Sequence, residues 1–240
     1  MIELRPFSAL GETCNDWLEA HHHFCFARYQ NPERMNWGSL RVVNHNILAP
    51  GADASPHPQD NMEMISYVRR GVIAHTGSFG ENHRTLAGEV RLISPGAGIT
   101  HADINPGNRP AEYLEIWIAA DTLGGKPKRQ TMKFPRRPGQ LVAVASGFPE
   151  DRHAMPLRAN ARVLAARLAA GVSVTYVPRP GRQVYAVSVA GRIDVNDVRL
   201  GPHDGAAIIN EPVVGITALK AAEIILVDVR CGEVVSKASA

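Results

Sequence analysis

The stretch "PHPQDNME" (residues 56–63) lies between a loop rich in Gly, Ala, Ser and Pro and the apolar run "MISYV". It belongs to a longer frame, which is written Gly51-x5-His57-x-Gln59-x3-Glu63-x7-Gly71. A histidine followed two residues later by a second ligand, and then by an acid, is one arrangement with which a β-barrel binds a metal ion. Because the second position holds Gln59 and not a histidine, the stretch predicts a metal site, a weakened one or the remnant of one.

A second frame follows in "SPGAGITHADINP" (94–106) and is written Gly88-x9-Gly98-x2-His101-x3-Asn105. Together, and in this order, the two frames resemble the paired motifs of the cupin superfamily, whose small β-barrels hold a metal in the barrel mouth. One such frame is a weak indication, whereas two in the right order are a strong indication of the fold. They say less about whether a metal is bound.

The N-terminal stretch "HHFCFARYQNPERMNWGSLRVVNHN" (22–46) sharpens this resemblance. It looks like the N-terminal signature of the pirin family, which are two-domain cupins. The matching residues are His22, Phe24, Phe26, Tyr29, Pro32, Leu40, Arg41, Val42 and Asn44, and Cys25 takes the place of a serine. The resemblance covers most of residues 1–120 closely, while the second half agrees in pattern and length only.

The resemblance implies a mononuclear iron, or a similar divalent metal such as Ni, Cu, Mn or Zn, bound by three histidines and one glutamate in the N-terminal barrel. His57 and His101 carry over onto this set. Gln59 stands at the second histidine position, and Asp103 stands at the glutamate position. Two of the four ligand positions therefore depart from the family pattern.

The two departures should affect metal binding to different extents. An amide oxygen is a poorer ligand than imidazole for Fe, Ni, Cu or Zn, whereas Asp103 keeps the negative charge on an arm one methylene shorter. Two histidines with one carboxylate resemble the ligand set that leaves positions open for substrate and O₂. The alternative is that His57 and His101 only form hydrogen bonds within a degenerate pocket.

Short apolar runs separated by Gly, Pro or Asn predict an all-β protein with two similar β domains in tandem. The resemblance implies that both are cupin-type, jelly-roll-like barrels. We expect the N-terminal barrel in residues 1–134 and a barrel without a metal motif in residues 135–240, joined by a polar connection at 121–140. The predicted strands are 38–49 with a turn at Asn44, two strands in 64–77, then 88–96, 112–120, 140–147, 161–171, 172–178, 182–196, 205–210 and 222–229. A turn or two of helix is expected in "NDWLEAHHH" (15–23).

Composition excludes several classes of protein. A net charge of +3 and the lack of a basic stripe argue against direct binding to nucleic acid. The apolar runs are too short to span a bilayer, and the N-terminus lacks the pattern of a signal peptide, so a cytoplasmic location is expected. The three cysteines have no C-x-x-C spacing and predict neither a disulfide framework nor a zinc knuckle.

Other titratable residues receive less specific predictions. Glu63 is expected to support a strand rather than to bind the metal. His45 and His75 are expected on adjacent strands, either at the pocket mouth or as hydrogen-bonded residues of the barrel wall. His153 and His203 are expected to be solvated loop residues.

Two functions remain open from the sequence. The resemblance implies a dioxygenase that acts on quercetin-like flavonols, or on another small enediol or aromatic compound, with O₂ as co-substrate and Asp103 as general base. The alternative is a metal-free or weakly metal-binding module with a regulatory role and a protein partner, as the family's animal members suggest. The loss of two ligands favours the second function, since a binding barrel tolerates changes of ligand better than an oxygenase does.

Overall fold

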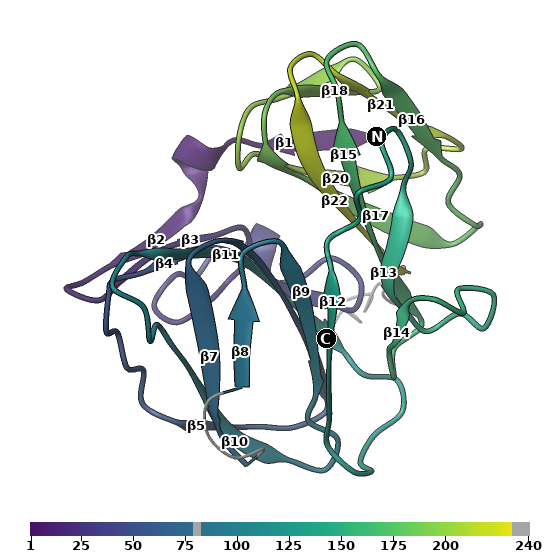
Figure 1. The fold of residues 1–240 in the computed structure, drawn as a ribbon. Helices are drawn as coiled ribbons and strands as arrows, with labels where there is room; N and C mark the ends of the chain where they lie inside the picture. The colour runs from purple at the N-terminus through teal and green to yellow at the C-terminus, as the bar shows by residue number, and fades with distance from the viewer. Residues whose placement is uncertain (79–82, 232–240) are drawn as a thin grey trace, which may run out of the picture.

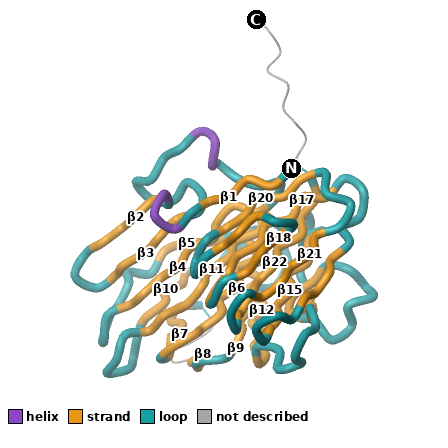
Figure 2. Tube along the Cα trace, turned by 90° about the horizontal axis from the view of Figure 1, so that it is seen from above, coloured by secondary structure: helices purple, strands orange, loops and turns teal. Residues whose placement is uncertain are grey.

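The structure is a computed structural model, and it describes residues 1–78 and 83–231. It consists of four β-sheets, of which two have seven strands and two have four. Besides these strands it contains two short 3-10 helices, η1 (Phe7–Ala9) and η2 (Pro32–Arg34), within the described ranges (Figures 1 and 2). The predicted all-β class with two cupin-type barrels is confirmed.

The N-terminal barrel contains β2 (Gly11–Cys14), β3 (Leu18–His22), β4 (Leu40–Leu48), β5 (His57–Gln59), β6 (Met62–Arg70), β7 (Val72–Gly77), β8 (His83–Leu86), β9 (Glu89–Ser94), β10 (Ile99–Ile104), β11 (Ala111–Ala119) and β12 (Lys128–Lys133). Its large sheet has the order β12-β9-β6-β11-β4-β3-β2. Its small sheet has the order β5-β10-β7-β8, so both sequence motifs contribute a strand to the small sheet.

The C-terminal barrel contains β13 (Val142–Ser146), β14 (Met155–Pro156), β15 (Ala161–Leu168), β16 (Ser173–Tyr176), β17 (Arg182–Ala190), β18 (Ile193–Val195), β19 (Val198–Leu200), β20 (Gly205–Ile209), β21 (Val214–Ala218) and β22 (Ala222–Arg230). Its sheets have the orders β1-β20-β17-β22-β15-β13-β14 and β16-β21-β18-β19. The first strand, β1 (Ile2–Arg5), thus pairs with β20 and lies among the strands of the second half (Figure 1). The division of the chain at residues 134 and 135 stays a prediction.

The two large sheets share one apolar core. On β11 the side chains alternate, and Leu114, Ile116 and Ile118 are buried in a cluster that also contains Val163 and Val227 of the second barrel. The other face of β11 carries Tyr113, Glu115 and Trp117, which border a cavity. One strand therefore joins the two barrels and also forms a wall of the candidate site.

The two barrels differ in what fills them. A cluster of apolar side chains, among them Leu164, Val184, Ile193, Leu200 and Ile216, fills the C-terminal barrel. In the N-terminal barrel the apolar clusters are small, and many buried residues are polar, including His75, Arg91 and His101. Because buried polar groups need partners, the N-terminal barrel is the candidate location of a ligand or metal site.

Two local predictions are wrong. Residues 15–23 do not form a helix, because Leu18–His22 form β3 and pair along β4, with Ala20 opposite Asn46. Asn44 is not in a turn, because β4 runs without interruption from Leu40 to Leu48. In both cases pairing with distant strands outweighs the local propensity.

The polar segment 121–140 is not entirely a connection, because β12 lies within it and pairs with β9. The run 161–171 is a strand as predicted, although its composition also suits a helix, since β15 pairs with both β13 and β22. Among residues 1–78 and 83–231, no helix has the length and apolar character that crossing a bilayer requires.

Candidate metal centre and ligand cavity

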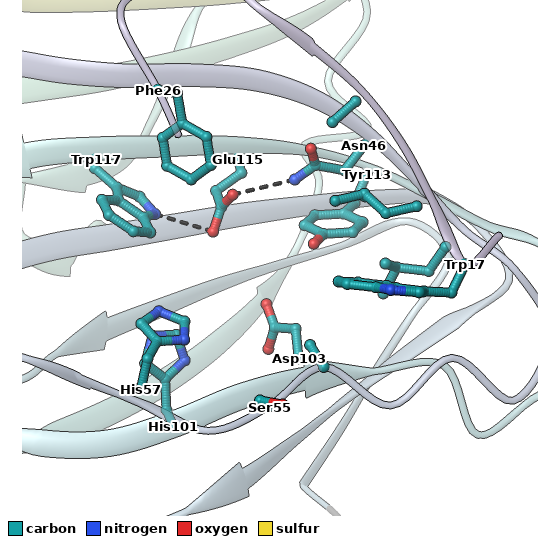
Figure 3. Close-up of a pocket in the computed structure, with 14 residues that line it drawn as sticks. Trp17, Phe26, Asn46, Ser55, His57, His101, Asp103, Tyr113, Glu115 and Trp117 are labelled. Carbon is teal, nitrogen blue, oxygen red and sulfur yellow. Dashed lines mark hydrogen bonds between the residues drawn. The ribbon is translucent and has the colours of Figure 1, made fainter. Parts of the chain in front are cut away.

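A cavity of about 350 Å³ lies inside the N-terminal barrel. Figure 3 shows His57, His101 and Asp103 on one wall, with Glu115 and Asn46 on the opposite wall. Pockets for small molecules have volumes of about 300–1,000 Å³. The cavity is therefore the candidate functional site.

Strand pairing assembles the first wall. His101 of β10 lies opposite His57 of β5, and Asp103 of β10 lies opposite His75 of β7. Directly opposed residues of an antiparallel pair share a face, and so do residues two apart on one strand. All four side chains therefore belong to one face of the small sheet, and the ring centroids of His57 and His101 are 4.5 Å apart.

His101 carries the neutral imidazole that metal binding requires. Its side chain is buried, and burial lowers its pKa from 6.5 to about 4. Within the described residues, neither of its two buried ring nitrogens has a hydrogen-bond partner. Because leaving a buried polar group without a partner costs free energy, this imidazole is well suited to a ligand that arrives from the cavity.

Arg91 holds Asp103 in a buried ion pair. Nη1 of Arg91 donates to Oδ1 of Asp103 at 2.8 Å, and Nη2 donates to Oδ2 at 2.6 Å and to Oγ of Ser66 at 2.8 Å. Burial opposes the charge of Asp103, but the guanidinium holds the pKa of this carboxyl well below its usual range. A carboxylate has about four lone-pair positions, so the two hydrogen bonds of Arg91 leave about two positions for further partners.

His75 joins this group from the neighbouring strand. Its side chain is fully buried, its Nδ1 lies 3.8 Å from Oδ1 of Asp103, and its ring stacks on His101 with centroids 5.3 Å apart. One ligand atom from each of His75, His101 and Asp103 lies within 4.8 Å of the other two. Two imidazoles and one carboxylate in such proximity form a 2-His-1-carboxylate set.

Gln59 lies apart from this group. It stands on β5 opposite Ile99 and lines a separate shallow depression together with Pro58, Gly98 and Thr100. Of the four residues that the motifs predict as ligands, three border the cavity and Gln59 does not.

Glu63 contacts neither His57 nor His101 in this arrangement. Its Oε2 accepts a hydrogen bond from Oγ of Ser94 at 2.6 Å and one from the backbone N–H of Arg158 at 3.3 Å. Burial raises the pKa of Glu63. Glu63 thus links two strands of the first barrel to the second barrel.

Glu115 dominates the opposite wall. Nε1 of Trp117 donates to its Oε1 at 2.9 Å, and Nδ2 of Asn46 donates to its Oε2 at 3.1 Å. Burial, together with the negative charge of Asp103, raises the pKa of Glu115 to about 7. A carboxyl group with this pKa exchanges its proton readily at neutral pH.

Aromatic rings form much of the remaining surface of the cavity. They belong to Trp17, Phe26, Tyr113 and Trp117. Phe26 and Trp117 meet edge to face with ring centroids 5.6 Å apart. Rings of this kind favour flat, largely apolar ligands.

A second group of possible ligands lies away from the cavity and consists of His45, Glu112 and His203. Nη1 of Arg69 donates to Oε1 of Glu112 at 2.8 Å, and His45 contacts the same oxygen at 3.2 Å. This carboxylate is thus already neutralised by Arg69, and the group is an ion-pair network between the barrels.

The structure corrects two predictions about histidines. His45 and His75 do not lie on adjacent strands, because β4 and β7 belong to different sheets. His203 is not a solvated loop residue, because its ring packs on His45 with centroids 4.0 Å apart, and burial lowers its pKa to about 4. Contact with the first barrel, which a loop sequence does not reveal, accounts for its burial.

Sequence reasoning missed Arg91, Asn46 and Glu115 as residues of the site. A signal was present for two of them, because Arg91 and Glu115 are charged residues within otherwise apolar strand patterns. A charge in a buried strand needs a partner. The identity of that partner depends on strand pairing, which the sequence alone does not supply.

The donor groups on this wall fit a divalent metal. Imidazole nitrogens and a carboxylate suit Fe, Ni, Cu and Zn, and the ring nitrogens of His101 are buried without a partner in the described part of the chain. His57, His101 and Asp103 come from the two motifs, and His75 is within reach of the last two. The set differs from three histidines and a glutamate by the position of Gln59 and by the shorter, arginine-bound Asp103.

Comparisons with known proteins agree with this architecture. The family model described as Pirin matches residues 3–118, and the model described as Quercetinase C-terminal cupin domain matches residues 143–229. The pirin-like protein of Caulobacter vibrioides is 46% identical over 95% of this chain and 99% of its own length. The quercetin 2,3-dioxygenase of Escherichia coli K12 is 29% identical over 95% of this chain and 98% of its own length.

A solved structure shows the same arrangement of both barrels. It is that of the bacterial pirin YhhW from Escherichia coli in complex with nickel(II), which superposes with a TM-score of 0.91 at 28% identity and covers 96% of this chain and 100% of that one. Its similarity extends over both halves of the sequence. With the two matching family models and the full-length relatives, it shows that this chain belongs to the pirin family of cupin proteins.

Proposed function

We propose that this pirin is a metal-dependent dioxygenase that acts on a flat aromatic enol of the flavonol type, with O₂ as co-substrate. The observation that carries the proposal is a cavity with a His57–His101–Asp103 wall on one side and aromatic rings around the rest. The name of the Escherichia coli relative, quercetin 2,3-dioxygenase, supports the substrate class. The nickel complex of YhhW supports a metal in this fold.

In this proposal His57, His101 and Asp103 hold the metal, and His75 takes the position that the motif assigns to Gln59. When bound, a divalent ion of the Fe²⁺ or Ni²⁺ type supplies a Lewis acid for an oxygen atom of the substrate and for O₂. Both oxygens of Asp103 accept hydrogen bonds from Arg91. We therefore assign Asp103 the role of ligand and not the role of general base that the family resemblance implies.

The aromatic residues position the substrate in this proposal. Trp17, Phe26 and Trp117 offer ring faces and edges against which a planar fused ring system packs. Filling the cavity with such a ring displaces water, which strengthens the electrostatic interactions of the remaining polar groups. The hydroxyl and oxo groups of a flavonol would then lie between the histidine wall and Glu115.

Metal loading followed by an oxygen-electrode assay tests the proposal. Protein loaded with Fe²⁺ or Ni²⁺ should consume O₂ when quercetin is added, and chelated protein should not. His101→Ala, which removes one ligand, should abolish both the metal content and the O₂ uptake. Protein that holds one metal ion per chain but consumes no O₂ with quercetin would contradict the substrate assignment.

The two alternative ligands, His75 and Gln59, give a prediction with a built-in control. His75→Ala should lower the affinity for Ni²⁺ by about 10–100-fold or more, the size of effect seen when groups of a metal site are removed. Gln59→Ala should change it less than about twofold, because Gln59 lines a different depression from His57, His101 and Asp103, whereas His75 lies within reach of the last two. Isothermal titration of Ni²⁺ into the wild type and the two variants measures both effects. If only Gln59→Ala lost affinity for Ni²⁺, Gln59 and not His75 would be the ligand, as the motif predicts.

One observation favours the second function, a binding barrel that works without metal. The guanidinium of Arg91 already neutralises Asp103, as a metal cation would. In that case the cavity binds an aromatic ligand with no oxygenation, and the barrel serves a regulatory role through its ligand or a protein partner. Elemental analysis after loading with Fe²⁺ or Ni²⁺ separates the two functions, because a binding barrel of this kind stays free of metal and still quenches tryptophan fluorescence with quercetin.

A further inference from the structure

We propose that Glu115 is the general base that removes the hydroxyl proton of the substrate. The proposal rests on the proposed function, since it concerns the same cavity and the same class of substrate. Glu115 borders the cavity and faces Asp103 across it (Figure 3). The two carboxylates therefore stand on opposite walls, and a flat ligand between them meets both.

The hydrogen bonds of Glu115 prepare it for this role. Each oxygen accepts one hydrogen bond, from Trp117 at 2.9 Å and from Asn46 at 3.1 Å. An ionised carboxylate accepts about four hydrogen bonds, so lone pairs remain on both oxygens. The two donors fix the carboxylate between β4 and β11, which keeps its free lone pairs in one place while a substrate binds.

Asp103 is less suited to take the proton. Both of its oxygens are engaged by the guanidinium of Arg91, and the pair is buried. A bidentate arginine stabilises the ionised carboxylate, so a proton gains little by moving there. Among the residues that the structure describes, no cationic side chain donates to Glu115, whose partners are a neutral indole and a neutral amide.

The charges around Glu115 support the same division of roles. Asp103 faces it from β10 and raises its proton affinity, whereas Arg91 on β9 acts in the opposite direction, and Tyr113 lies on the same strand. On the neighbouring strands, the residues directly opposite Glu115 are the uncharged Asn44 and Ser66. His57 and His101 stand on the far wall.

The proposed step is a simple proton transfer. The O–H bond of the substrate's hydroxyl breaks, its electron pair stays on oxygen, and the proton forms a new O–H bond on Glu115. The substrate becomes an anion that is ready to react with O₂, and Glu115 keeps the proton inside the cavity. The transfer therefore releases no proton to the solvent.

Binding of 3-hydroxyflavone, a flavonol with a single ionisable hydroxyl, tests the step without turnover. The probe is added to nickel-loaded protein at pH 8 in the absence of O₂. Absorption distinguishes the bound anion from the neutral form, and calorimetry in buffers of different ionisation enthalpy counts the protons released. In wild-type protein we expect the anion band with little proton release, because Glu115 takes the proton.

Glu115→Gln keeps the shape and the hydrogen-bonding capacity of the side chain but removes the base. We expect the bound probe either to remain neutral or to release one proton to the buffer when it ionises. Turnover of quercetin should fall by about 10²–10⁴-fold, and Glu115→Asp should recover part of it. Glu63→Gln is the matched control, because Glu63 is also a buried glutamate but does not border the cavity.

The outcomes separate the two proposals. An anion that forms with equal proton release in wild type and Glu115→Gln would overturn the role of Glu115 and leave the proposed function intact. A wild-type protein that binds metal but fails to bind the probe would overturn the substrate class, and the role of Glu115 with it. A changed proton count in Glu115→Gln, with Glu63→Gln like wild type, supports the general base.

Discussion

Replacing Arg91 with methionine should lower the free energy of unfolding of the metal-free protein by about 3–5 kcal/mol, the usual cost of removing one partner of a buried ion pair. Arg91 and Asp103 are both buried, and the guanidinium makes both hydrogen bonds of the fork. Methionine fills similar space without the charge, so the carboxylate of Asp103 loses its partner. Urea unfolding at pH 7.5 in the presence of a chelator measures the loss.

A double variant separates charge from packing. Asp103→Asn combined with Arg91→Met removes the unpaired carboxylate, so the double variant should be more stable than Arg91→Met alone. Equal unfolding midpoints for the single and the double variant would show that Asp103 carries no uncompensated charge. The cycle requires all four proteins, because the two residues are in direct contact.

Metal should reverse the loss in the single variant. In the wild type, the positive charge of Arg91 and a metal cation compete for the same carboxylate. Without Arg91, Asp103 is available to Ni²⁺ and the repulsion between two cations is gone, so Ni²⁺ affinity should rise by about tenfold or more. If Arg91→Met neither binds Ni²⁺ more tightly nor regains stability with it, Asp103 is not a ligand.

The motifs predicted one wall of the site because each of them contains a strand of the small sheet, and these two strands, β5 and β10, pair with each other. His57, His101 and Asp103 border the cavity since each belongs to a short strand whose alternation decides which side chains point inward. The motif did not reveal that Gln59 lines a different surface. Gln59 is the last residue of β5 and pairs with Ile99 at the end of the ladder, where the residues around it are Pro58, Gly98 and Thr100.

The opposite wall could be predicted only in part. The alternation of β11 places Tyr113, Glu115 and Trp117 on one face, but it does not show which of the two faces borders the cavity. The answer depends on the second barrel, whose apolar residues cover Leu114 and Ile116. The hydrogen bond between Asn46 and Glu115 joins residues 69 positions apart, which no local pattern contains.

The wrong predictions of secondary structure have the same cause, which is pairing between strands. The local sequence of β3 permits a helix, but the strand pairs with both β2 and β4, so Ala20 lies in the buried layer and the backbone groups of Leu18–His22 find partners on two sides. The segment 121–140 was expected to be a connection, and β12 forms there because β9 offers an unpaired edge. The sequence therefore predicted best where both residues of a contact belong to the two motifs.

The pH dependence of stability should report on Glu115 independently of any ligand. The pKa of Glu115 is about 7 in the folded protein, against an ordinary value of 4.5. Between pH 4.5 and 7 the folded chain therefore keeps a proton that the unfolded chain has released, so this group makes stability fall as pH rises. The contribution is present below pH 4.5 and is lost by pH 7, a change of roughly 3 kcal/mol.

The titration of His101 changes stability with pH in the opposite direction and partly cancels the effect of Glu115. Its pKa is lowered from 6.5 to about 4, so the unfolded chain binds a proton below pH 6.5 that the folded chain refuses. Stability from His101 is therefore present above pH 6.5 and is lost as pH falls toward 4. In the wild type the two groups oppose each other, and only a difference between two proteins isolates Glu115.

Glu115→Gln supplies that difference, because glutamine does not titrate. Relative to wild type, the metal-free variant should gain about 3 kcal/mol of stability between pH 4.5 and pH 7.5. Urea unfolding of both proteins at these two pH values, with a chelator present, gives the result, and Glu12→Gln on the exposed surface of β2 is the control. A difference that does not change with pH would mean that Glu115 titrates alike in the folded and unfolded chains. The carboxylate would then gain no proton affinity from its buried position opposite Asp103, and its suitability as a base near neutral pH would be lost.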